Sequence, residues 1–132
     1  MLLVDTNVLV DVLQDDPQWS DWSLHQLRVQ SQVHALVINS VVYAEVSLSF
    51  STIEALDAVL DRMGLTVQEM PKAALFLAGK AFGQYRRRGG TKTQVLPDFF
   101  IGAHAAVQGW PLLTRDAARF RTYFPGVIVL GP

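Results

Sequence analysis

The sequence predicts an α/β fold whose core is a mainly parallel sheet covered by helices. Short apolar runs alternate with longer segments in which apolar residues recur three and four positions apart. Strands and helices that alternate in this way form parallel sheets joined by right-handed crossovers. The 132 residues contain no repeat, linker or low-complexity tract, so we expect a single domain that spans residues 1–132.

The first strand and the first two helices are predicted near the N-terminus. Leu2–Val4 is a short apolar run, and after the turn at Asp5–Asn7 apolar residues recur at helical spacing through residues 8–13. The sequence Asp-Asp-Pro that ends at Pro17 should break this helix. Because proline is favoured in the first turn of a helix, we expect Pro17 to begin the second one.

The middle of the chain predicts a buried strand followed by two helices. Residues 35–38 are continuously apolar, which is typical of a strand covered on both faces. The segment 41–50 contains β-branched residues but is longer than most strands, so we predict a helix with Ser40 as its N-cap. Residues 53–63 repeat at helical spacing and stop at Gly64, a typical C-terminal glycine.

The second half of the chain continues the alternation of strands and helices. From residue 97 to 107 nearly every position is apolar, which predicts a helix buried on all sides. We also predict strands at 65–70, 112–113 and 127–130, helices that begin at Pro71 and at Asp116, and a loop over 91–96.

Composition excludes several classes of protein. The chain has no cysteine, so it has neither a disulfide framework nor a cysteine-based metal site. No apolar run approaches the roughly 20 residues that cross a bilayer, and no signal peptide is evident, so we expect a cytoplasmic protein without membrane contact. With 50% hydrophobic and 17% charged residues, part of the surface should be covered by a second copy or a partner chain.

Four acidic residues occupy positions where a solvent-exposed side chain is not expected. Asp5 and Asp116 follow predicted strands, where open α/β sheets build their sites. Asp98 begins the most apolar helix, and Glu45 has apolar neighbours one turn away on either side. Taken singly, Asp5 and Asp116 are also typical helix caps, Asp98 also complements a helix dipole, and Glu45 is compatible with the rim of an amphipathic helix.

A single cause that explains all four acids is a shared cation. Carboxylates brought together repel one another, and they remain ionised only if a cation compensates them. With oxygen ligands and no paired histidines, the cation of choice is Mg²⁺ or Mn²⁺. Such a site is suited to activating water against a phosphodiester.

A short basic segment is the main candidate for contact with a polyanion, because the net charge of −1 does not indicate nucleic-acid binding overall. This segment is either the C-terminal cap of a helix or a patch that holds an RNA backbone. Its residues are Arg86, Arg87, Arg88 and Lys92.

The acids lie in motifs that resemble those of PIN-domain ribonucleases, and most closely the VapC toxins of bacterial type II toxin–antitoxin pairs. The resemblance covers essentially the whole chain in the right order. The matching segments are Asp5–Leu9 (DTNVL), Val42–Val46 (VYAEV), Leu96–Ala105 (LPDFFIGAHA) and Leu112–Asp116 (LLTRD).

This resemblance implies a three-layer α/β/α sandwich and an acidic quartet of Asp5, Glu45, Asp98 and Asp116 that binds Mg²⁺ or Mn²⁺. Asp5 and Asp98 would be the most direct ligands. It further implies an endoribonuclease that uses a metal-activated water, forms a homodimer and is silenced by a VapB-like antitoxin. Support for the metal ligands would come from Thr114, Thr6 and Asn7.

The sequence also departs from the family pattern and leaves alternatives open. Many relatives carry a further polar or acidic residue shortly after the fourth acid, whereas here Ala117 and Ala118 precede Arg119, so the number of bound metals stays open. An aspartyl-phosphate phosphotransfer domain and a noncatalytic PIN-like binding module are the alternative functions. The sequence does not name the RNA, and it does not separate RNA from DNA.

Overall fold

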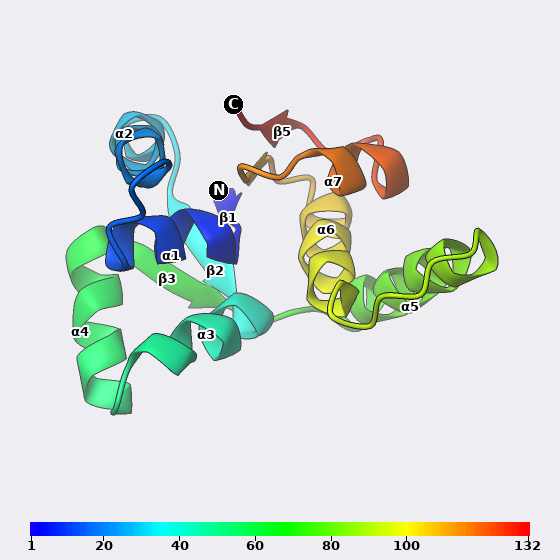
Figure 1. The fold of residues 1–132 in the computed structure, drawn as a ribbon, viewed down its shortest axis with the longest axis horizontal. Coiled ribbons are helices and arrows are strands. Elements are labelled where there is room, and N and C mark those ends of the chain that lie inside the picture. Colours follow the sequence, from blue (N-terminus) through cyan, green and yellow to red (C-terminus); the bar gives the residue numbers. More distant parts are fainter.

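The computed structural model describes residues 1–132 and is built around a five-stranded sheet with the order β3-β2-β1-β4-β5 (Figure 1). Every neighbouring pair of strands is parallel, which confirms the predicted fold class. The strands are β1 (Leu2–Val4), β2 (Leu36–Asn39), β3 (Leu65–Gln68), β4 (Leu112–Leu113) and β5 (Val129–Leu130).

Helices cover both faces of the sheet and complete a three-layer α/β/α sandwich. The chain runs from β1 outward to β3 and then returns to β4 and β5, so right-handed crossovers place α1 to α4 on one face and α5 to α7 on the other (Figure 1). None of these helices combines the length and apolar character needed to cross a membrane. The helices are α1 (Thr6–Leu13), α2 (Ser20–Ser31), α3 (Ser40–Val46), α4 (Ile53–Met63), α5 (Lys72–Arg87), α6 (Leu96–Gln108) and α7 (Ala118–Tyr123), with a 3₁₀ turn η1 (Ser47–Ser49).

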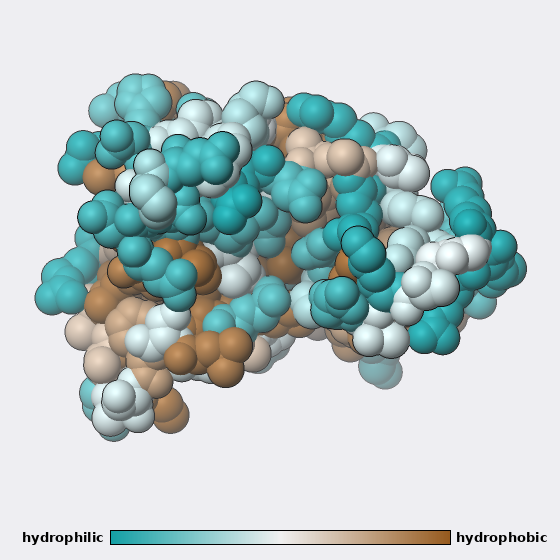
Figure 2. Space-filling view, in the orientation of Figure 1, coloured by the Kyte–Doolittle hydropathy of each residue, from teal (hydrophilic) through white to brown (hydrophobic).

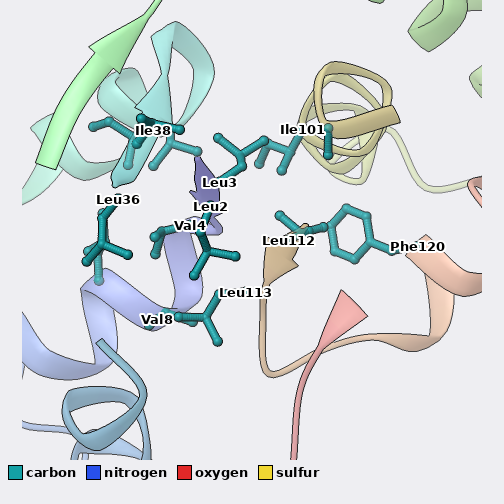
Figure 3. Close-up of a cluster of buried hydrophobic side chains, with 14 of the residues drawn as sticks. Leu2, Leu3, Val4, Val8, Leu36, Ile38, Ile101, Leu112, Leu113 and Phe120 are labelled. Atoms are coloured by element: carbon teal, nitrogen blue, oxygen red, sulfur yellow. The ribbon is translucent and has the colours of Figure 1, made fainter. Parts of the chain in front are cut away.

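The central strand β1 explains why the first apolar run has no polar position. Leu2, Leu3 and Val4 are all completely buried, because helices cover both faces of the sheet. Figure 3 shows their side chains among those of neighbouring strands and of α6, which contributes Ile101. A methyl group at Gly102 on α6 would lie 2.4 Å from the ring of Phe124, the residue that follows α7. Only glycine therefore allows α6 to pack this closely against the end of α7.

Two predicted helix starts differ from the structure, and a side-chain cap explains one of them. The second helix begins at Ser20, while Pro17 lies in a preceding turn where Oδ1 of Asp16 accepts backbone hydrogen bonds. The N-cap of α3 is Asn39 instead of Ser40, since the Asn39 Oδ1 accepts the N–H of Val42 at 3.0 Å. The amide of Asn39 therefore takes the capping position that was predicted for the hydroxyl of Ser40.

Several other helices and strands are shorter than the sequence predicts. The helix predicted over 41–50 ends at Val46 and continues as the 3₁₀ turn, and the last helix begins at Ala118 rather than Asp116. The predicted strands over 65–70 and 127–130 are each reduced to their paired residues. Helix α6 is buried through its middle as expected, but Val107 in its last turn is 40% exposed.

The direction of the crossovers reverses between β1 and β4, and this reversal positions the site. Open parallel sheets bind ligands at the carboxyl ends of strands on either side of such a switch point. Here β1 pairs with β4 through Leu3–Leu112 and Val4–Leu113. The residues that follow Val4 and Leu113 therefore emerge side by side at one edge of the molecule.

Candidate metal centre

The four acids singled out from the sequence line one cavity at this edge, with a volume of about 270 Å³. Asp5 follows β1 directly, Asp116 follows β4, Glu45 comes from α3, and Asp98 lies in the first turn of α6. Thr6 and Asn7 line the same cavity. The fold thus brings together carboxylates from four separate segments of the chain.

Asp5 is the most buried of the four acids, with only 4% of its surface exposed. Its Oδ1 accepts the backbone N–H of Thr6 at 2.7 Å, and its Oδ2 accepts the hydroxyl of Thr114 at 2.7 Å. Asp5 is also the N-cap of α1. The capping role and the place in the cavity are therefore both present in the same side chain.

Thr114 fixes the orientation of this carboxylate because its own hydrogen-bonding capacity is fully used. Its hydroxyl oxygen accepts the side-chain amide of Asn7 at 3.2 Å and the backbone N–H of Asp116 at 3.1 Å. A hydroxyl has one proton and two acceptor positions. With both acceptor positions filled, the proton of Thr114 is directed at Asp5.

The other three acids differ in their partners. The hydroxyl of Thr6 donates to Oε1 of Glu45 at 2.7 Å, so Thr6 links the Asp5 and Glu45 carboxylates. Arg119 donates from Nη1 to Oδ2 of Asp98. Asp116 is exposed, its carboxylate makes no hydrogen bond within the chain, and it does not cap α7.

The acids also affect each other's protonation. The pKa of Asp5 is raised to about 7, mainly by burial and to a smaller extent by the charges of Asp98 and Glu45, while hydrogen bonds from Thr114 and Thr6 oppose the shift. Burial also raises the pKa of Asp98 against the opposing charge of Arg119, with Glu45 and Asp116 adding to the rise. These mutual effects place the four carboxylates within electrostatic range of one another.

The donor set suits a hard divalent cation, although the side chains are not preassembled around one. No three of the acidic or histidine side chains already stand in a ligating arrangement, since Asp98 is turned to Arg119 and Glu45 to Thr6. The carboxylates of the cavity nonetheless offer oxygen ligands and negative charge, as Mg²⁺ and Mn²⁺ prefer.

The basic segment Arg86–Lys92 lies apart from this cavity. None of its residues lines the cavity, and α5, which carries the arginines, projects away from the sheet (Figure 1). Arg86 packs over the ring of Phe82 and Arg88 over that of Tyr123, both with the guanidinium carbon 5.3 Å from the ring centroid. A role of this segment in RNA binding stays a prediction.

Sequence reasoning missed three charged residues that border the site. Arg115 lines the cavity and donates from Nε to the buried Asp11, while Arg119 pairs with Asp98. One signal was available, because Asp11 falls four residues after Asn7 and so shares its helix face. The pairing of each arginine depends on side-chain placement that spacing does not reveal.

Comparison with known families agrees with this geometry. The family model of the PIN domain matches residues 2–124. The chain belongs to the PIN domain family. PIN domains are generally nucleases and typically depend on divalent metal ions. A search among curated protein sequences finds no match.

Solved structures share the fold of this PIN domain at low sequence identity. VapBC2 from Rickettsia felis, bound to a DNA fragment from its promoter, gives a TM-score of 0.75 at 20% identity, over 99% of this chain and 98% of that one. VapBC-1 from nontypeable Haemophilus influenzae gives 0.74 at 16% identity, and DNA-bound VapBC from Salmonella typhimurium gives 0.72 at 19%, each over 98% of this chain and 96% of the other.

Proposed function

We propose that this PIN domain is a divalent-metal-dependent endoribonuclease, the toxin of a VapBC-type toxin–antitoxin pair, contained in a single domain. One observation carries the proposal. Carboxylates from β1, α3, α6 and the segment after β4 meet around one cavity at the switch point of the sheet. Family membership supports the same reading, since PIN domains are generally nucleases.

The residues around the cavity divide into three roles. Asp5 and Asp98 are the direct ligands of Mg²⁺ or Mn²⁺ in this proposal, and Thr114 holds the Asp5 carboxylate in place. The bound cation would supply an acidified water and would neutralise charge that develops on the phosphate. Asp116, whose carboxylate has no partner in the chain, is free to accept the proton that the water loses.

The sequence around Asp5 favours hydrolysis over the aspartyl-phosphate alternative. An aspartyl-phosphate mechanism of the Asp-x-Asp type needs a second acid two residues after the nucleophile. Here Asp5 is followed by Thr6 and Asn7, so that second acid is absent. Incubation with acetyl phosphate, a small phosphodonor, should therefore leave the protein unlabelled.

The test compares three conservative variants with a matched control. Glu45→Gln keeps an oxygen that accepts the hydrogen bond from Thr6, and Asp116→Asn breaks no side-chain hydrogen bond. Asp98→Asn weakens only the hydrogen bond from Arg119. Each should lose Mn²⁺-dependent cleavage of total RNA by more than about 100-fold, because several kcal/mol of charge stabilisation disappear. Asp61→Asn, at an exposed position on α4, should cleave like the wild type.

Two outcomes would contradict the proposal in different ways. Full cleavage by all three variants would exclude a role for the acidic cavity. Binding of Mn²⁺ in isothermal titration without any cleavage by the wild type would favour the noncatalytic binding module. The addition of EDTA to the wild-type reaction should stop cleavage if the proposal holds.

Apolar surface supports the proposed antitoxin and the proposed homodimer. Leu48 is 89% exposed and Ile53 is 67% exposed, and Ile53 borders an open cavity of about 200 Å³ with Phe50 and Leu56. Figure 2 shows hydrophobic side chains gathered over the end of α3 and the start of α4. Exposed apolar patches of this kind mark protein interfaces.

The partner proposal is tested by coexpression with the product of the neighbouring reading frame. Copurification of a small protein that stops RNA cleavage would support an antitoxin, and a persistently free toxin would contradict it. Light scattering on the isolated protein should give twice the chain mass of 14.6 kDa for a homodimer.

A further inference from the structure

Arg115 borders the acidic cavity but is held by a residue outside it. Its Nε donates to Oδ2 of Asp11 at 2.8 Å, and the hydroxyl of Ser23 donates to the same oxygen at 2.8 Å. The Asp11 side chain is only 2% exposed. Because Asp11 on α1 and Ser23 on α2 are both buried, they form a fixed anchor for the guanidinium.

Two further contacts hold Arg115 in one place. Its guanidinium carbon lies 5.6 Å from the ring centroid of Trp19, a cation–π contact, and Trp22 packs edge-on against that ring. Its backbone N–H donates to Oδ1 of Asn7 at 3.4 Å. The side chain therefore lies against a rigid aromatic surface and cannot easily turn toward the carboxylates.

The outer end of this guanidinium is free. Nε makes the only side-chain hydrogen bond of Arg115, so Nη1 and Nη2 have no partner within the chain, and 32% of the side chain is exposed. Planar guanidinium groups bind phosphate through two parallel hydrogen bonds. Arg119 differs, because its Nη1 is already engaged by Asp98.

The negative charge of the cavity indicates which group the free end of Arg115 binds. Four carboxylates repel the phosphates of a nucleic acid, and a cation bound among them would offset only part of that repulsion. We propose that Arg115 binds a backbone phosphate of the nucleic-acid strand that enters the cavity, with Asp11, Ser23 and Trp19 as its support. This inference rests on the proposed function, since it identifies how the substrate of that site is held.

The first experiment measures binding without cleavage. The probe is a 5′-fluorescein-labelled 12-nucleotide oligouridylate, followed by fluorescence anisotropy in Ca²⁺ buffer at several KCl concentrations. Arg115→Gln should weaken binding about 10-fold or more, because a charge-assisted hydrogen bond is lost. The slope of log affinity against log salt should fall by about one.

A matched control separates this contact from general charge. Arg62→Gln removes the same charge from an exposed position on α4, outside the cavity, and should leave both affinity and slope unchanged. Arg115→Lys keeps the charge but loses the fork and the Nε anchor, so its affinity should lie between those of the wild type and Arg115→Gln.

A second set of probes identifies the group that is bound. A DNA strand of matched sequence should suffer the same loss in Arg115→Gln, because the contact is to phosphate and not to the 2′-hydroxyl. A series of oligouridylates is then prepared, each with one phosphate replaced by an uncharged methylphosphonate. The oligonucleotide that is neutralised at the contacted phosphate should bind the wild type and Arg115→Gln with equal affinity. A loss confined to RNA, or no such position, would overturn the inference.

A purely structural Arg115 gives a different result. Arg115→Gln would then change the free energy of unfolding in urea while leaving the salt slope as in the wild type, which would overturn the inference. Cleavage with Mn²⁺ is measured separately. If the wild type fails to cleave but Arg115→Gln still weakens binding, the proposed function fails and the phosphate contact stands, whereas wild-type protein that binds neither strand refutes the contact.

Discussion

Two groups of charged side chains lie side by side at the carboxyl edge of the sheet, and their charges are balanced differently. In the first, Arg115 is paired with the buried Asp11, whose carboxylate also accepts the Ser23 hydroxyl. In the second, four carboxylates share one cavity and have Arg119 as their ion-pair partner, through Asp98. Arg115 and Arg119 are four residues apart, yet they belong to different groups.

The contrast separates a structural ion pair from an exchangeable one. Asp11 is 2% exposed, so breaking its pair would leave a buried charge uncompensated. Asp98 is 31% exposed and is repelled by Glu45 and Asp116, so we expect a divalent cation to displace Arg119 from it. We therefore expect the first group to stabilise the fold, and the second, whose carboxylates repel one another, to lower its stability.

The largest expected effect is the pH dependence that Asp5 imposes on the metal-free protein. Its pKa rises from 3.8 to about 7 on folding, so the folded state holds this proton more tightly than the unfolded chain does. As far as Asp5 is concerned, stability is therefore highest below pH 4, falls by about 4 kcal/mol between pH 4 and 7, and is constant above that range. Urea unfolding in EDTA at pH 4 to 8 measures this.

Addition of Mn²⁺ should reverse that loss, most strongly above pH 7, because the cation binds the ionised carboxylate. In Asp5→Asn the pH-dependent contribution should be absent. The variant should also lose some stability independently of pH, because its side-chain NH₂ group would face either the N–H of Thr6 or the hydroxyl of Thr114, both of which are donors. A wild-type slope that persists in Asp5→Asn would assign the pH dependence to another group.

The second prediction removes one aspartate from each group. Asp11→Ala should lower the free energy of unfolding by about 2 to 4 kcal/mol, because it leaves Arg115 and Ser23 without their shared acceptor. Asp98→Ala should change it by less than about 1 kcal/mol, since a partly exposed pair is lost while repulsion from Glu45 and Asp116 is relieved. Equal losses in the two variants would erase the distinction between the groups.

The third prediction concerns competition between an arginine and the metal. Arg119→Gln should tighten Mn²⁺ binding about fivefold in isothermal titration, because the cation no longer displaces a guanidinium worth about 1 kcal/mol from Asp98. Arg115→Gln should change the affinity less, since its partner is Asp11. The opposite order would show that Arg115 is the exchangeable arginine.

The smallest expected effect lies within the acidic group. Glu45→Gln keeps the hydrogen bond from Thr6 but removes one negative charge near Asp5. The pKa of Asp5 should therefore move down toward its ordinary value, while burial keeps it above 3.8. The carboxyl ¹³C shift of Asp5, followed by NMR against pH, measures this, and an unchanged pKa would indicate that the two carboxylates do not interact.

Sequence patterns were sufficient to locate the acids but not to describe their partners. Asp5 and Asp116 could be placed because buried strands end just before them, and strand ends meet at one edge of a parallel sheet. Glu45 and Asp98 could be placed because a carboxylate on an apolar helix face is costly without a reason. These four inferences needed only periodicity and the topology rule.

The remainder depended on side-chain geometry that no spacing encodes. The saturated hydroxyl of Thr114 and the choice of Asp11 by Arg115 arise from contacts between segments about a hundred residues apart. Helix starts also escaped prediction, because Asn39 rather than the adjacent Ser40 provides the cap of α3. Asn39 and Ser40 have similar propensities for the N-cap position, so packing decides which of them caps the helix.

The late position of β4 has a consequence for synthesis of the chain. One whole side of β1 has no hydrogen-bonding neighbour until residues 112–113 have emerged from the ribosome. Thr114 and Asp116, which complete the cavity, follow immediately afterwards. A growing chain that folds from its N-terminus therefore stays unable to assemble the cavity until residue 116 has been released from the ribosome.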